Sequence, residues 1–275
     1  MALECGFWRL HEPDYPSDYQ HTFVNGELEH PFGMPGVRCG CCGNTWGGGR
    51  ILPYALPESL RKRKELRDGW PIDHEAHRAL QAEVLTALRA EGHLVEAVRP
   101  GDSFQPGVLD IPSRPEADFL WAALGSVVVS ERIRTAFLAA GVKGAVFAPV
   151  TPRKIGRRSA KLPAPIPSSG EPEDLITELR ATTPANAIPS LFELVVTADS
   201  GRPPGAREFT ICECCGREQY DREGRQLVLL PEMWRGEDVF FLATTTHIVV
   251  TDPVRELLRN LRATNVRLTS LAGTG

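Results

Sequence analysis

The sequence CGCCG at residues 39–43 recurs with one change as CECCG at residues 212–216. In both stretches the spacing C-x-x-C lets one tight turn present two sulfur atoms to the same metal ion. A glycine follows the last cysteine of each stretch, and glycine permits the positive φ with which such a turn folds back. Two knuckles of this kind supply four thiolates, which is the ligand set of a closed structural zinc site.

The ligand assignment follows from the spacing within each knuckle. We predict that one structural Zn²⁺ is bound by the first and last cysteines of the two stretches, which are Cys39, Cys42, Cys212 and Cys215. Cys41 and Cys214 lie inside the knuckles, where we expect their side chains to point away from the ion. Because 169 residues separate Cys42 from Cys212, the ion would join distant parts of the chain and close a very long loop.

Other uses of these cysteines stay open. Each C-x-x-C is also the spacing of a thioredoxin-like redox pair, although that motif opens a helix after a strand and these stretches lie among Gly, Pro and Trp. They would otherwise be buried free thiols, or ligands of a catalytic zinc with an open coordination position. His30 precedes the first knuckle and is a candidate for a substitute ligand. The total of seven cysteines is odd, which argues against a scaffold held by disulfides.

Composition narrows the class of function. The 275 residues are 42% hydrophobic and carry a formal net charge of −4. An acidic chain is a poor candidate for coating a nucleic-acid backbone, so nucleic acid is an unlikely partner. No apolar run is long enough for a transmembrane helix and the start shows no secretory signal, so we expect no membrane partner and a cytoplasmic location. No nucleotide-binding or hydrolase motif is found, and we predict that the protein is not an enzyme.

The apolar pattern predicts an α+β fold. Residues 73–91 form the clearest helix, because Asp73 can cap it and Leu80, Val84 and Leu88 recur at helical spacing. A short basic helix is expected over 56–67, and a long loop broken by prolines over 100–115. Further strands are expected at residues 7–10, 127–129, 145–150, 191–196, 247–250 and 266–271, with helices beginning at 130–131 and 251–253.

A repeated sequence pattern suggests a duplicated architecture. Residues 129–134 read VSERIR and residues 250–255 read VTDPVR, so each is a strand end, a Ser or Thr cap, an acid and a helix. A cysteine cluster precedes each copy. We therefore predict one domain, 1–275, of two similar strand-helix-strand lobes joined by a zinc-knuckle pair with four cysteine ligands. The N-terminal lobe would cover about 1–150, a Pro-rich basic loop about 151–172, and the C-terminal lobe about 173–275.

These features resemble a known family, the myxobacterial double-CXXCG-motif proteins grouped with the Sit swarming-inhibition immunity proteins. The resemblance is carried by GMPGVRC at 33–39, Cys42-Gly43, Thr45-Trp46, GDSF at 101–104, Pro106-Gly107, Cys212, Cys215-Gly216, LPE at 230–232 and VVT at 249–251. It implies a cytoplasmic immunity protein that binds and neutralises a cognate toxin delivered by kin. The extra Cys41 and Cys214 depart from the pattern and leave the ligand set open to exchange.

A zinc-ribbon module that contacts nucleic acid or the transcription machinery is the alternative function. It would need basic residues beside the knuckles, where Arg38 and Arg217 are nearly alone. The toxin-binding surface is expected on the loops 100–115 and 149–172. The second loop carries a basic cluster of Arg153, Lys154, Arg157, Arg158 and Lys161, which would steer an acidic partner and is otherwise a solvated loop. His74 and His77 are expected in the solvated first turn of a helix.

Overall fold

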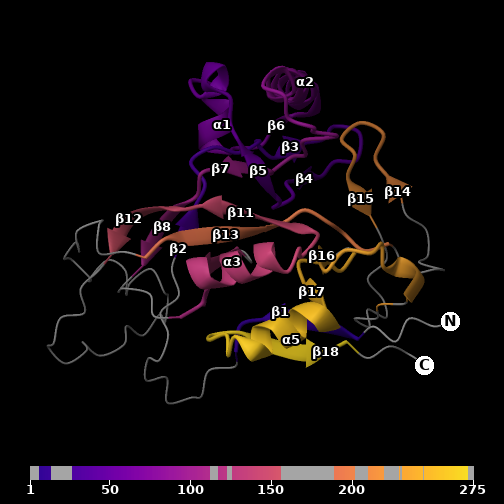
Figure 1. Ribbon diagram of the computed structural model, residues 1–275. Coiled ribbons are helices and arrows are strands. Elements are labelled where there is room, and N and C mark those ends of the chain that lie inside the picture. The colour runs from indigo at the N-terminus through magenta and orange to yellow at the C-terminus, as the bar shows by residue number, and fades with distance from the viewer. Residues whose placement is uncertain are drawn as a thin grey trace, which may run out of the picture. The chain divides into compact units, whose positions relative to one another are not determined.

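The computed structural model shows a mixed arrangement of several small sheets and few helices (Figure 1). It describes residues 6–13, 27–111, 117–122, 126–155, 189–201, 210–219, 229, 231–243 and 245–271. The chain divides into two compact units. Unit 1 comprises residues 1–29, 107–200 and 235–271, and unit 2 comprises residues 30–106, 201–234 and 272–275. Each unit therefore combines segments from both halves of the chain.

Unit 1 contains most of the strands. Its elements are β1 (Phe7–His11), β2 (Glu27–Glu29), β8 (Val108–Ile111), β9 (Phe119–Trp121), β10 (Val127–Ser130), α3 (Glu131–Ala139), β11 (Ala145–Pro149), β12 (Thr151–Ile155), β13 (Leu191–Val196), β16 (Val239–Phe241), β17 (Ile248–Thr251), α5 (Asp252–Asn260) and β18 (Arg267–Ser270). The strands expected at 7–10, 127–129, 145–150, 191–196, 247–250 and 266–271 are confirmed within a residue or two.

β10 and α3 show how the sequence builds these elements. Residues 127–129 are all valine, whose β-branched side chain favours a strand, and all three are buried. Ser130 follows, and its hydroxyl oxygen accepts a hydrogen bond from the backbone N–H of Ile133 at 3.4 Å, which caps α3. α5 begins differently. Thr251 is in the capping position, but its hydroxyl donates to Asp238 Oδ1 at 3.2 Å, so the hydroxyl cap expected there is not formed.

Two four-stranded sheets of unit 1 have matching strand orders, β9-β10-β13-β11 and β16-β17-β1-β18. In each, an antiparallel hairpin leads into a helix and then an outer strand. The central strand comes from a distant segment, and its register is the same in both sheets: Phe192 pairs with Val129, and Trp8 pairs with Val250. Because β1 completes the sheet of β16–β18 and β13 that of β9–β11, separate N- and C-terminal lobes are not confirmed.

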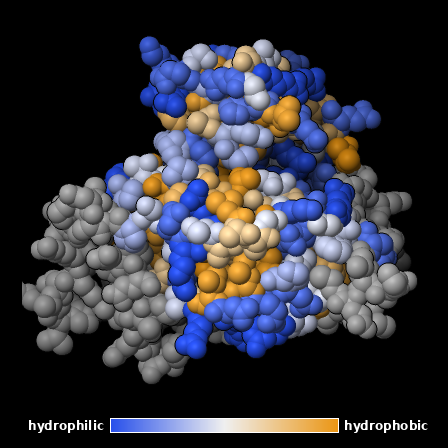
Figure 2. Space-filling model, in the orientation of Figure 1, coloured by the Kyte–Doolittle hydropathy of each residue, from blue (hydrophilic) through white to orange (hydrophobic). Residues whose placement is uncertain are grey.

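One apolar cluster holds these two sheets together. It includes Val129 and Phe137 from one strand-helix pair and Val250 and Leu258 from the other, all almost fully buried. α3 and α5 also contact each other. Burial of apolar side chains is the main source of stability in a domain. Hydrophobic residues also reach the surface around α3, as Figure 2 shows, and Leu138 is 57% exposed.

Unit 2 contains both cysteine clusters. Its elements are β3 (Val37–Arg38), β4 (Thr45–Trp46), β5 (Ile51–Ala55), a 3-10 turn η1 (Glu58–Leu60), α1 (Glu65–Asp68), β6 (Ile72–Asp73), α2 (His74–Ala90), β7 (Ser103–Gln105), β14 (Thr210–Ile211), β15 (Glu218–Gln219) and a 3-10 turn η4 (Pro231–Met233). The helix expected over 73–91 is confirmed as α2. Asp73 caps it by accepting from the backbone N–H groups of Glu75 and Ala76 at 3.0 and 2.9 Å.

Three expectations about local structure are wrong. The basic helix over 56–67 is two short pieces, η1 and α1. The loop over 100–115 contains β7 and β8, because β7 pairs with β5 and β8 lies between β12 and β2. Residues 151–155 of the basic loop form β12, where Arg153 is bound by Asp110 at 2.7 Å and Glu29 at 2.8 Å. Residues 156–172 of that loop lie outside the described residues.

In the parts of the chain that the structure describes, no helix combines the length and apolar character needed to cross a bilayer.

Candidate metal centre

The two knuckles have the same local geometry. In the first, the backbone N–H of Gly43 donates to the carbonyl of Cys39 at 2.9 Å, and in the second Gly216 donates to Cys212 at 2.7 Å. Gly43 and Gly216 have φ values of +69° and +71°, where a side chain would strain the backbone. The hairpin β3–β4 carries the first knuckle and β14–β15 the second. The turn geometry inferred from the sequence is therefore present twice.

The knuckles place four sulfur atoms together. Cys39 Sγ lies 3.7 Å from Cys212 Sγ, and Cys42 Sγ lies 3.9 Å from Cys215 Sγ. All four lie within 4.8 Å of one another. Four sulfurs at a Zn–S distance of about 2.3 Å in tetrahedral geometry are about 3.8 Å apart. The four cysteines that the sequence singled out are thus close enough to hold a metal ion.

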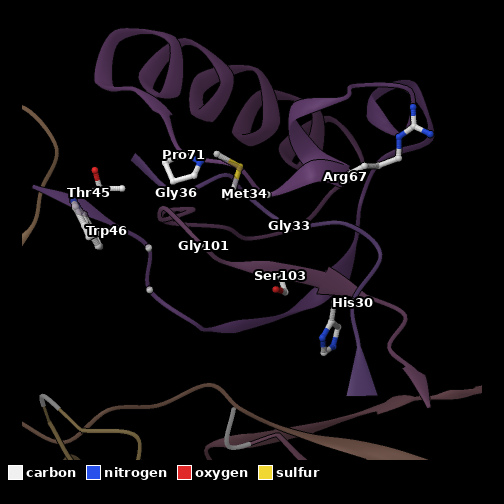
Figure 3. Close-up of a pocket in the computed structure, with 13 residues that line it drawn as sticks. His30, Gly33, Met34, Gly36, Thr45, Trp46, Arg67, Pro71, Gly101 and Ser103 are labelled. Carbon is white, nitrogen blue, oxygen red and sulfur yellow. The ribbon is translucent and has the colours of Figure 1, made fainter. Parts of the chain in front are cut away.

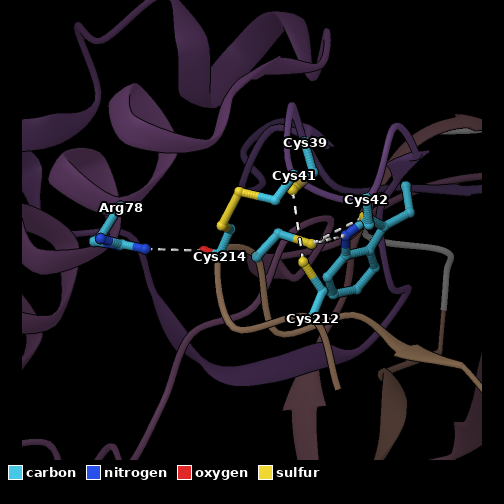
Figure 4. Close-up of a disulfide and its surroundings, with 8 residues drawn as sticks. Cys39, Cys41, Cys42, Arg78, Cys212 and Cys214 are labelled. Carbon is cyan, nitrogen blue, oxygen red and sulfur yellow. Dashed lines mark hydrogen bonds between the residues drawn. A yellow bond between two sulfur atoms is a disulfide. The ribbon is translucent and has the colours of Figure 1, made fainter. Parts of the chain in front are cut away.

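The inner cysteines of the knuckles form a disulfide, Cys41–Cys214, with Cα atoms 6.4 Å apart (Figure 4). This Cα distance lies within the ordinary range for a disulfide. This disulfide was not expected, because the odd total of cysteines argued against a scaffold held by disulfides. The odd number of cysteines did not predict the pairing, because six of the seven lie in two knuckles whose equivalent positions face each other.

Hydrogen bonds favour the thiolate form of two of the four cysteines. The backbone N–H and the side chain of Asn44 lower the pKa of Cys42 to about 6. The backbone N–H of Cys215 is the largest cause that lowers the pKa of Cys212. Burial raises the pKa of Cys215 to about 11, although Trp46 Nε1 donates to its sulfur at 3.3 Å. Since a metal binds thiolates and releases thiol protons, the lowered pKa values of Cys42 and Cys212 favour metal binding at these two sulfurs, whereas the raised pKa of Cys215 opposes it.

Three residues around the knuckles were not identified from the sequence as part of the site. Trp46 and Asn44 follow the first knuckle within the same hairpin, and Arg78 comes from α2. The guanidinium of Arg78 donates to the carbonyl oxygen of Cys214 at 3.0 Å (Figure 4). Asn44 and Trp46 could have been found from the sequence, because they lie next to the first knuckle. No local pattern would have indicated Arg78, because it lies 136 positions from Cys214 in the sequence.

The histidines occupy other places. His30 is not in the metal-ligating group that the described residues form, and it lines a separate cavity. His77 was expected in solvent, but it is only 4% exposed, and this burial lowers its pKa. Its side chain lies with His74, Arg78 and Glu213 along a cavity of about 360 Å³ beside the second knuckle.

A second cavity of unit 2, of about 450 Å³, is lined largely by glycine backbone (Figure 3). Gly101 has a φ of +83°, and a Cβ on it would lie 2.0 Å from the carbonyl oxygen of Gly48. The GDSF stretch at 101–104 therefore requires glycine at its first position for close packing of two backbones. Its neighbour Asp102 is 1% exposed and accepts a hydrogen bond from the backbone N–H of Arg99 at 2.7 Å. This packing explains the stretch without a ligand.

No protein-family model and no curated protein matches this chain.

Proposed function

We propose that Cys39, Cys42, Cys212 and Cys215 bind one Zn²⁺ as a structural site. The observation that carries this proposal is the spacing of the four sulfurs, at 3.7 and 3.9 Å for the closest pairs across the knuckles. Thiolates at this spacing suit a tetrahedral ion, and soft thiolate ligands select zinc among the common divalent ions without redox chemistry. Four protein ligands fill the coordination shell, so the proposed role is to hold the two knuckles together.

Metal analysis tests this assignment directly. Protein purified under reducing conditions should contain one Zn²⁺ per chain, and X-ray absorption should give four sulfur neighbours at about 2.3 Å. Less than about a third of an equivalent of zinc, or nitrogen and oxygen neighbours in place of sulfur, would contradict it.

We further propose that the protein acts by binding a protein partner rather than by catalysis. The partner is the cognate toxin of a kin-delivery system, and the protein neutralises it in the cytoplasm. The support is the resemblance at the two knuckles and a metal centre that offers no open position to a substrate. The product of the neighbouring gene should bind the purified protein in a pull-down. Its failure to bind, together with an absence of protection in cells that express it, would refute the immunity role.

Residues 157–168, which include the basic residues Arg157, Arg158 and Lys161, are our proposed contribution to the toxin interface. They lie outside the described residues. Arg153 of the same basic cluster lies in β12, where it forms ion pairs with Asp110 and Glu29. Deletion of residues 157–168 should leave zinc content unchanged and weaken both toxin affinity and protection. Unchanged protection would place the interface elsewhere.

We also propose that the chain is a duplication of a unit made of a strand, a cysteine knuckle and a strand-helix-strand segment. The matching registers of the two sheets in unit 1 and the matching turns of the two knuckles in unit 2 support it. The first strand of each copy, β1 or β13, then pairs with the hairpin and outer strand of the other copy.

A further inference from the structure

The two knuckles are joined at three pairs of equivalent positions. Cys39 faces Cys212, Cys42 faces Cys215, and Cys41 is bonded to Cys214, each across a sequence separation of 173 residues. Two kinds of cross-link, a metal ion held by four sulfurs and a covalent disulfide, would thus close the same loop of the chain.

We propose that Cys41–Cys214 is a site of reversible thiol–disulfide exchange with low-molecular-weight thiols, and that its redox state sets how tightly the adjacent centre holds its metal ion. This inference rests on the metal centre proposed above. It adds a function to the two cysteines that depart from the double-CXXCG pattern.

Loop closure is the first reason for coupling. Bringing the two knuckles together restricts the chain between them and costs conformational entropy. The cross-link that forms first bears this entropic cost. The second cross-link then forms without it. Coupling between two binding events is reciprocal, so the disulfide strengthens metal binding by the same factor by which the metal stabilises the disulfide.

Proximity is the second reason. The sulfur atoms of Cys41, Cys214 and the ligand Cys39 lie within 4.8 Å of one another. The disulfide therefore fixes the two knuckles directly beside the four-sulfur group, and its reduction removes that constraint from the ligands. We expect a tighter site in the oxidised protein.

The exchange reaction balances with a thiol such as glutathione. The thiolate attacks Cys41 Sγ, a mixed disulfide forms, and Cys214 Sγ leaves as a thiolate that takes up a proton. A second glutathione thiolate then attacks the mixed disulfide and releases Cys41. Two glutathione molecules lose one electron and one proton each to form glutathione disulfide, and the two cysteine sulfurs gain two electrons and two protons.

Exposure directs this reaction to the inner pair. Cys41 is exposed, whereas the ligand Cys39 is 1% exposed. A thiolate from solvent can therefore reach Cys41 Sγ, and exchange takes place only at a disulfide sulfur. A bound cation would further protect the four ligand sulfurs, because their lone pairs would be engaged.

The test is a zinc-affinity measurement in the two redox states. Zinc-loaded full-length protein is prepared oxidised or reduced with glutathione, and its Zn²⁺ is titrated against a chromophoric chelator. We expect the oxidised protein to bind Zn²⁺ at least about tenfold more tightly. The double variant Cys41→Ser/Cys214→Ser should bind more weakly than oxidised protein and show no redox dependence. Cys5→Ser is the matched control, since Cys5 lies outside both knuckles, and it should retain the full difference.

A second measurement must agree with the first. In glutathione buffers the midpoint of Cys41–Cys214 reduction, followed by alkylation and mass analysis, should shift to more negative potential when Zn²⁺ is saturating. A tenfold affinity difference corresponds to about 30 mV for this two-electron couple.

The outcomes separate this inference from the metal centre itself. Equal zinc affinity in both redox states, or release of zinc on oxidation, would refute the coupling and leave the centre standing. If neither the oxidised nor the reduced protein binds zinc, both the coupling and the metal centre are refuted.

Discussion

The three cysteines of each knuckle differ in what their sulfur atoms contact. Cys39 and Cys42 point their sulfurs toward the other knuckle's first and last cysteines, whereas Cys41 Sγ is bonded to its own counterpart, Cys214. A position within the knuckle thus determines whether a sulfur joins the four-sulfur group or the disulfide.

Serine substitutions should separate these two roles in reducing buffer. Cys39→Ser or Cys215→Ser removes a proposed metal ligand and should lower the free energy of unfolding by about 3 kcal/mol or more, because binding energy at a structural site is folding energy. Cys41→Ser and Cys214→Ser should cost less than about 1 kcal/mol there. Urea denaturation with zinc analysis checks this, and equal losses at all four positions would contradict the ligand assignment.

Asp102 gives the protein a predictable response to pH. Burial raises the pKa of its carboxyl group from 3.8 to about 6, against the opposing effects of the Arg99 backbone N–H and the Arg50 and Arg99 charges. The folded protein therefore binds this proton more tightly than the unfolded chain. The stabilisation from protonated Asp102 is complete below about pH 3.8 and is lost as the pH rises through about 6.

Asp102→Asn should remove this contribution. Between pH 4 and pH 6 the unfolding free energy of the unmodified protein should fall relative to that of the variant by up to about 1.4 kcal/mol per pH unit. Urea denaturation at several pH values measures the difference. Parallel pH profiles for the two proteins would show that Asp102 is not the responsible group.

At the scale of elements, α2 connects the fold of unit 2 to the knuckles. Its first turn follows β6, which pairs with β3 just before the first knuckle, and Arg78 reaches the second knuckle. The Asp73 cap therefore supports the element that carries Arg78. The hydrogen bond from the backbone N–H of Ala76 is the largest cause that lowers the pKa of Asp73. The carboxylate form, which caps the helix best, is therefore kept at lower pH than in an ordinary aspartate.

Removal of this cap is the corresponding test. Asp73→Ala should lower Tm by about 2–4 °C, because two backbone N–H groups lose their acceptor. Asp73→Asn keeps an acceptor oxygen and should retain most of the stability. Thermal unfolding followed by circular dichroism distinguishes the variants, and an asparagine variant as unstable as the alanine one would contradict the capping role.

Local signals explain which elements were predicted correctly. Each of the helices α2, α3 and α5 begins with a capping residue or a proline, and apolar residues at helical spacing follow directly. The sequence alone is therefore enough to predict these three helices. β7 and β8 form through partners far along the chain, such as β5 and β12, and their flanking prolines indicated a loop. The ion pairs of Arg153 were not expected for the same reason, since its partners Asp110 and Glu29 are distant in sequence, although its side chain stays 47% exposed.

The candidate site was predictable in part for a related reason. The C-x-x-C spacing determines which sulfurs share a side of the turn, and the two knuckles have matching turns, so the four-sulfur group follows from the sequence. The disulfide and the contact of Arg78 depend on how the two knuckles and α2 meet, which no local pattern encodes.

At the scale of the whole molecule, all six knuckle cysteines belong to unit 2. Removal of the metal by a chelator should therefore loosen unit 2 selectively. In hydrogen exchange, the Gly43 and Gly216 amides, which close the knuckle turns, should lose at least about tenfold in protection, whereas the amides of β17 in unit 1 should stay unchanged. Equal loss of protection in β17 would contradict this selectivity.

The pairing of each knuckle cysteine with its own counterpart has a consequence for how the site can be assembled. Cys39 meets Cys212, Cys41 meets Cys214, and Cys42 meets Cys215. Subunits of a symmetric homodimer meet in this way at their axis. A fragment carrying a single knuckle would own only two of the four sulfurs, and two such fragments would have to associate before an ion found its full set of ligands.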